Sequence, residues 1–142
     1  MSGRTLVVAI PGDPEQRTGG YVYDRRLAAE LTRRGWRVER LRLPEGFPLA
    51  DEAALAEAAR CFATVPRGSL VLVDGLAYGA MPDLAAALAR EHRLVALVHH
   101  PLGYETGLAP EAVERLIASA RAALAHAAAV VVTSATTRET RP

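Results

Sequence analysis

The stretch Thr5-Leu6-Val7-Val8-Ala9-Ile10, which stops at Pro11-Gly12, decides the class of fold that this chain adopts. It is a short, uninterrupted run, mostly apolar and rich in β-branched side chains, and it ends at two residues that break regular structure. Such a run is typical of a strand buried on both faces of its sheet. Strands of this kind belong mainly to parallel sheets with helices packed on both faces. The N-terminal segment therefore predicts an α/β protein.

The rest of the chain alternates helical patterns with further strands. Pro82 and Pro110 stand where the first turn of a helix tolerates proline, and Gly35 stands where a helix ends. The alternation predicts a Rossmann-like, doubly wound parallel sheet of about five or more strands with three α/β/α layers, in one domain over residues 1–142. Strands are expected at 5–10, 36–43, 69–74, 94–98 and 129–133, and helices before 35, at 51–63, at 82–90 and at 110–124.

The second strand and the helix before it carry most of the charge. Seven arginines lie between positions 25 and 42, interleaved with Asp24, Glu30 and Glu39. We interpret this segment as a solvated face and expect the polar strand near a sheet edge, while contact with anionic lipid is the alternative. The apolar face of the helix is expected to consist of Tyr23, Leu27, Ala28 and Leu31.

Composition excludes several classes of protein. The 142 residues carry 17 basic and 16 acidic side chains, so the net charge of +1 gives no field that would attract nucleic acid. All the basic residues are arginine, which excludes a Schiff-base lysine and a P-loop lysine. A single cysteine, Cys61, excludes a disulfide framework and is interpreted as a small buried hydrophobe. The N-terminal apolar run is too short for a signal peptide or a membrane span, so we expect a cytoplasmic protein without a transmembrane segment.

Ligands of such sheets bind beyond the carboxyl ends of the strands, which directs attention to four loops. The loop after the first strand ends in Gly19-Gly20-Tyr21 and opens into a helix. Two glycines allow close approach of the backbone, and the free N–H groups suit an anion such as a phosphate. A simple flexible turn is the alternative. Neither G-x-G-x-x-G nor a P-loop is present, so an ordinary NAD or ATP site is not expected.

The loop after the fourth strand begins with His99-His100 and contains Glu105. Either histidine could hold a sugar hydroxyl or transfer a proton, and Glu105 could pair with a histidine, bind a hydroxyl or remain solvated. Adjacent strand residues point to opposite faces, so one histidine should face the cleft while the other packs in the structure. A zinc site would need a third ligand, and His92 and His126 lie at helix ends away from this loop. No metal site is expected.

Two more strand ends supply candidate residues. Asp74 ends the third strand, where it could cap the following turn or face a ligand. Ser134 follows the fifth strand and is placed to start a further helix. It is a poor candidate for a hydrolase nucleophile, because no G-x-S-x-G elbow surrounds it.

Several of these segments carry a resemblance to a known family. Thr18-Gly19-Gly20-Tyr21, followed by Leu27-Ala28-x-x-Leu31-x-x-x-Gly35-Trp36-x-Val38, resembles the start of the group 1 (family 4) glycosyltransferases. Leu94-Val95-Ala96-Leu97-Val98-His99 is similar to that family's apolar strand ending in histidine. Val130-Val131-Val132-Thr133-Ser134, with Thr137, resembles the strand before the last helix of its N-terminal half. The order and spacing of these motifs extend over nearly the whole chain.

The resemblance implies a GT-B architecture, in which two Rossmann-like halves face each other across a cleft. It implies that this chain is the N-terminal, acceptor-side half. Such enzymes transfer a sugar from a nucleotide diphosphate sugar to a hydroxyl of a sugar, lipid or small molecule, with retention and usually without a metal or other cofactor. Gly19 and Gly20 would lie near the donor pyrophosphate, with Tyr21, Asp74, Glu105 and Ser134 around the donor or acceptor. His99, or His100 if the register shifts, would reach the transferred sugar.

The C-terminal GT-B half, with its E-x7-E carboxylates, has no counterpart here and becomes the expected partner domain. The isolated chain is therefore expected to fold but not to catalyse transfer. Two alternatives stay open. One is a non-catalytic Rossmann-like module that pairs with a partner domain, and the other is a small hydrolase that uses His99 or His100.

Overall fold

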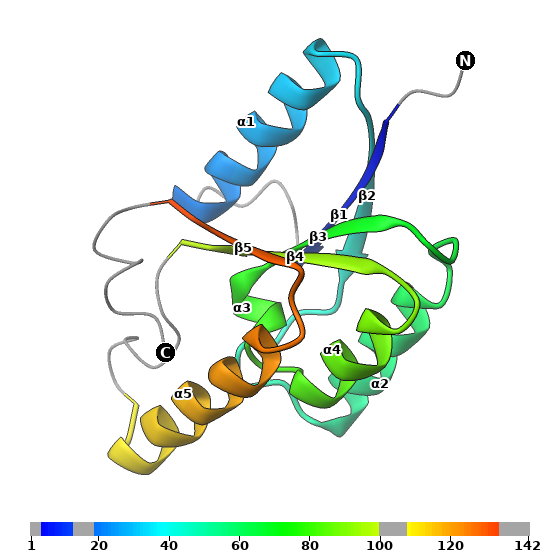
Figure 1. Ribbon diagram of the computed structural model, residues 1–142. Helices are drawn as coiled ribbons and strands as arrows, with labels where there is room; N and C mark the ends of the chain where they lie inside the picture. The colour runs from blue at the N-terminus through cyan, green and yellow to red at the C-terminus, as the bar shows by residue number, and fades with distance from the viewer. Residues whose placement is uncertain (1–3, 13–18, 100–107, 134–142) are drawn as a thin grey trace.

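The computed structural model describes residues 4–12, 19–99 and 108–133, and these form an α/β structure around a five-stranded sheet (Figure 1). Every strand pair in this sheet is parallel, which confirms the predicted Rossmann-like, three-layer arrangement. The strands are β1 (Thr5–Pro11), β2 (Arg37–Leu43), β3 (Leu70–Asp74), β4 (Arg93–Val98) and β5 (Ala129–Val132), and the helices are α1 (Gly19–Arg33), α2 (Glu52–Phe62), α3 (Gly75–Tyr78), α4 (Pro82–Ala89) and α5 (Pro110–Leu124).

The strand order, β2-β1-β3-β4-β5, creates a switch point between β1 and β3. The chain leaves β1 in one direction to form β2 and then passes to the other side of β1 to form β3. Because crossovers between parallel strands are right-handed, this reversal puts α1 on one face of the sheet and α2, α4 and α5 on the other (Figure 1). The crevice at the carboxyl ends of β1 and β3 is where ligands of such sheets bind.

Two apolar cores cover the faces of the sheet. Leu6, Val8 and Ile10 of β1 belong to the cluster under α1, together with Leu27 and Leu31 of that helix. The alternate β1 residues belong to the larger cluster on the opposite face, which includes Phe62 of α2, Met81 and Leu88. The first strand is therefore buried on both faces, as its sequence predicts, and the exposed residues of β2 confirm its expected position at an edge.

The local sequence determines where α1 ends and where α2 begins. Gly35 has φ +94°, and the N–H of Trp36 donates to the carbonyl of Leu31 at 3.0 Å, which is a Schellman ending. Asp51 caps α2 by accepting a hydrogen bond of 2.8 Å from the backbone N–H of Ala54. These contacts define where α1 ends and where α2 begins.

The segment after β3, where the sequence predicts a loop, contains a short helix. Residues Gly75–Tyr78 form α3, and Tyr78 is among the most buried side chains of the described chain. A side chain at position 75 would place its Cβ 3.0 Å from the carbonyl oxygen of Leu97 and 3.2 Å from Cα of Val98. Glycine at this position therefore allows α3 to lie directly against β4.

Two further properties concern Cys61 and membranes. Cys61, which the sequence predicts to be a small buried hydrophobe, is only partly buried where it packs against the larger core, and its Sγ lies 3.6 Å from the carbonyl oxygen of Arg42. Among the described residues, the structure contains no helix that is both long and apolar enough to cross a lipid bilayer.

Candidate functional site

Three side chains from separate elements meet at the carboxyl edge of the sheet. Asp74 is the last residue of β3, and His99 follows directly after β4. Asp74 pairs in register with Leu97, whose side chain faces α1, so Asp74 and His99 leave the sheet on the α1 side. Asp24 reaches them from the second turn of α1. The topology therefore assembles this cluster beside the switch point between β1 and β3, where the fold predicts a ligand site.

The imidazole of His99 faces both carboxyl groups with the same nitrogen atom. Its Nε2 is 2.9 Å from Oδ1 of Asp24 and 3.7 Å from Oδ2 of Asp74. An ionised carboxylate can only accept, so Nε2 donates to Asp24 in this arrangement. The Tyr23 ring stands edge-on to the imidazole, with 5.4 Å between ring centroids and 70° between ring planes. These contacts fix the orientation of the histidine ring.

The cluster is buried except on the histidine side. The side chains of Asp24 and Asp74 are 1% and 2% exposed, whereas that of His99 is 14% exposed. Oδ1 of Asp74 accepts a hydrogen bond of 2.9 Å from the N–H of Leu76 and so caps α3. Oδ2 of Asp74 and Oδ2 of Asp24 have no hydrogen-bond partner among the described residues. A buried polar atom without a partner costs about 1–3 kcal/mol, so this arrangement is expensive for folding alone.

Burial and the neighbouring acid change the protonation of Asp74. Burial is the largest cause, and the adjacent Asp24 carboxyl acts in the same direction, so that the pKa of Asp74 rises to about 8. The N–H of Leu76 acts in the opposite direction. At neutral pH Asp74 is therefore mainly protonated, while a proton or a cation is needed to relieve repulsion between the two acids. Strongly shifted carboxyl groups of this kind are concentrated at functional sites.

The chemistry of the cluster follows from these properties. A histidine held by one buried acid and close to a second can accept or donate a proton in a fixed direction. The three residues also supply one nitrogen and two oxygen ligand atoms that lie within 4.8 Å of one another. The site can therefore bind a proton or a small cation internally.

The structure places some of the predicted site residues and not others. His99 and Asp74 are brought together. One oxygen of Asp74 caps α3, which is one of the two alternatives predicted for it, and the other oxygen faces His99. Gly19, Gly20 and Tyr21 form the first turn of α1, directly before the turn that carries Asp24. His100, Glu105 and Ser134 lie outside the described residues.

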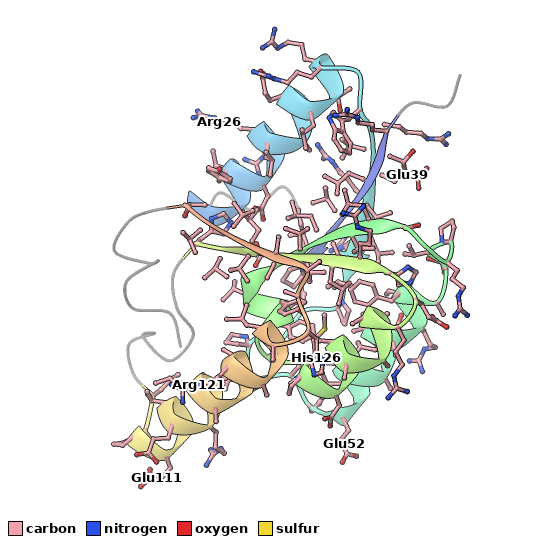
Figure 2. All side chains as sticks on the ribbon, in the orientation of Figure 1. Arg26, Glu39, Glu52, Glu111, Arg121 and His126 are labelled. Carbon is pink, nitrogen blue, oxygen red and sulfur yellow. The ribbon has the colours of Figure 1, made fainter. Side chains whose placement is uncertain are left out.

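Asp24 is the site residue that sequence reasoning missed. The interpretation of this segment as a solvated face is wrong for Asp24, which is 1% exposed. It holds for the arginines between 25 and 42, since all but one of them are exposed and Arg26 projects away from the sheet (Figure 2). Tyr23, placed on the apolar face, is 41% exposed, so that assignment is also wrong. Asp24 occupies the buried position instead. Its spacing of three, four and seven residues from Leu27, Ala28 and Leu31 is the signal that identifies it.

The other histidines take no part in this cluster. His92 precedes β4, so the length of the strand, roughly 20 Å, separates it from His99. His126 is exposed just beyond the end of α5 (Figure 2). The prediction that these two histidines lie away from His99 is confirmed, but the ligand atoms that accompany His99 are carboxylates, which the search for a third histidine did not consider.

Comparison of the sequence with models of known protein families finds no match, and comparison with curated proteins finds none either.

Proposed function

We propose that this chain is the acceptor-side domain of a retaining, nucleotide-sugar-dependent glycosyltransferase of the GT-B type. The contact between Asp24 and His99 is the observation that supports it most. It joins the helix that begins at Gly19-Gly20 to the end of β4, beside the switch point between β1 and β3. These are the two segments whose motifs resemble the donor-facing parts of the group 1 glycosyltransferases.

The proposed reaction uses features of α1 and β4. The first N–H groups of α1 attract the diphosphate of the donor, because the N-terminus of a helix carries partial positive charge. The bond between the anomeric carbon and the diphosphate breaks, and a bond from that carbon to the acceptor oxygen forms on the same face of the sugar. The acceptor proton leaves with the diphosphate. His99, oriented by Asp24, contacts the sugar and stabilises its position during transfer.

A second domain completes the proposed enzyme. The E-x7-E carboxylates and most of the donor site belong to the C-terminal half in the family that the motifs resemble, so the chain alone gives no turnover. We place the protein in the cytoplasm, where sugar nucleotides are available and where a single unpaired cysteine is usual. The exposed arginines of α1 and β2 provide for contact with an anionic membrane surface.

A titration of the isotopically labelled chain with sugar nucleotides tests this proposal. Uridine, guanosine and adenosine diphosphate hexoses are added separately, with free hexose and sulfate as controls. We expect weak, millimolar binding that shifts the amide resonances of Gly19, Gly20 and Asp24 and the ring resonances of His99. The variant Asp51→Asn, changed at the exposed cap of α2, should respond like the parent chain.

The outcomes separate the proposed enzyme from the alternative of a non-catalytic interaction module. Shifts restricted to the α1 and β4 segments, and produced by sugar nucleotides but not by sulfate, support the glycosyltransferase. Absence of any response in these segments to all three donors contradicts it and favours the interaction module, whose partner would contact other surfaces.

A further inference from the structure

The buried cluster has the composition and spacing of a metal site without further rearrangement of the backbone. One imidazole nitrogen and two carboxylate oxygens, contributed by α1, β3 and the residue after β4, lie within 4.8 Å of one another. Oδ2 of Asp74 points into the cluster, 3.7 Å from Nε2 of His99, and has no hydrogen-bond partner among the described residues. An ion bound among these atoms would give a partner to Oδ2 of Asp74, whose side chain is only 2% exposed.

We propose that Asp24, Asp74 and His99 bind one divalent transition-metal ion of the Zn²⁺ class. This inference goes beyond the proposed function and does not depend on it, because the ion can bind whether or not the chain takes part in sugar transfer.

The distances fit a small ion with bonds of about 2.0–2.2 Å, whose ligand atoms lie about 3.3 Å apart in a tetrahedron. The separation of 3.7 Å between His99 and Asp74 has to shorten slightly, and the separation of 2.9 Å between His99 and Asp24 has to lengthen as the ion replaces the proton on Nε2. Both adjustments are within the reach of side-chain rotation. The site can therefore form on the backbone as it stands.

The charge of the site and its types of ligand atom determine which ion it prefers. Two ionised carboxylates and a neutral imidazole balance the charge of a divalent cation, whereas the same two acids repel each other when the site holds no ion. Mg²⁺ and Ca²⁺ prefer ligand sets made of oxygen alone, while imidazole nitrogen favours Zn²⁺ and its neighbours in the first transition row. Three protein ligands leave a fourth position of the tetrahedron for water or another ligand.

Zinc titration of the whole chain by calorimetry tests the proposal. A Cys61→Ala background removes the only thiol, and His126→Ala removes an exposed surface histidine in a separate variant. Asp24→Asn and Asp74→Asn each remove the charge of one ligand but keep the shape of its side chain. Asparagine at position 74 can still cap α3. Asp51→Asn is the matched control, because it makes the same change at an exposed helix cap.

We expect one Zn²⁺ per chain, with an affinity that falls at least about tenfold in Asp24→Asn and in Asp74→Asn and stays unchanged in Asp51→Asn and His126→Ala. Zinc should raise the Tm of the parent chain and should not raise that of the two cluster variants. Binding that is equally strong in the cluster variants, binding lost in His126→Ala, or absence of stoichiometric binding would each overturn the proposal.

A spectroscopic measurement keeps the proposal testable if a cluster variant fails to fold. The nitrogen resonances of the His99 ring are followed in the parent chain while Zn²⁺ is added. A large shift at Nε2 of His99 supports the site. A shift confined to other histidines contradicts it.

Discussion

Nε2 of His99 lies 2.9 Å from Oδ1 of Asp24, although the two residues are 75 positions apart in the sequence. The contact joins α1 to the end of β4 and is almost completely shielded from water on the Asp24 side. Asp24→Ala removes the acceptor and leaves the Nε2 proton of His99 without this partner. We expect the free energy of unfolding to fall by about 1–3 kcal/mol, measured by urea denaturation.

The matched control for that variant is Glu39→Ala. Glu39 also belongs to a charged pair, with Arg37, but both side chains are exposed on the edge strand β2. Exposed pairs contribute little, so this change should alter stability by about 0.5 kcal/mol or less. Equal losses in the two variants would show that burial gives the Asp24–His99 contact no special weight.

The raised pKa of Asp74 predicts how the stability of the metal-free protein depends on pH. The folded chain holds this proton up to a pKa of about 8, whereas the unfolded chain releases it near the ordinary value of 3.8. The folded state therefore binds more protons between these two pH values, and the free energy of unfolding should fall as the pH rises from about 4 to about 8. Asp74→Asn should flatten this part of the profile, and Asp51→Asn should leave it as steep as in the parent chain.

Gly75→Ala tests the close contact between α3 and β4. The added Cβ would lie 3.0 Å from the carbonyl oxygen of Leu97, a backbone atom that cannot move away cheaply. We expect a loss of about 1–3 kcal/mol in stability and a displaced His99 ring resonance, because the strain falls between Asp74 and the end of β4. Gly35→Ala, at φ +94° with nothing within 4 Å, should also destabilise the chain but should leave the His99 resonance in place.

The larger core predicts a strong contrast between two apolar truncations. Phe62 on α2 is 1% exposed, so Phe62→Ala should lower the free energy of unfolding by about 3–5 kcal/mol. Leu49 is 61% exposed, and Leu49→Ala should change it by about 0.5 kcal/mol or less. Thermal and denaturant unfolding of both variants check the prediction, and a small effect at Phe62 would mean that α2 does not contribute to the main core.

The fold was largely predictable because its signals are local. The apolar run of β1, the charged residues of β2 and the glycine after α1 each report on a few neighbouring positions. The short helix α3 was not predictable by periodicity, because four residues complete hardly more than one turn. Its formation depends on the cap from Asp74 and on contact with β4, which only the folded chain supplies.

The candidate site was predictable only in part. Asp74 and His99 stand at strand ends, where the fold class itself directs attention. Asp24 depends on the rotation of α1 about its axis, and a shift of one residue exchanges it with Tyr23 between the buried and exposed sides. The presence of charged neighbours favoured the exposed assignment. The buried position of Asp24 depends on its contact with His99, and His99 is 75 positions away in the sequence.

The central claim is that Asp24, Asp74 and His99 form one site whose charged groups interact. Carbon NMR titration of the Asp74 side-chain carboxyl in the metal-free protein tests this claim most directly. We expect a pKa of about 8 in the parent chain and a lower pKa in Asp24→Asn, because that change removes the repulsion from the neighbouring acid. A pKa near 3.8 in the parent chain, or one that Asp24→Asn leaves unchanged, would contradict the claim.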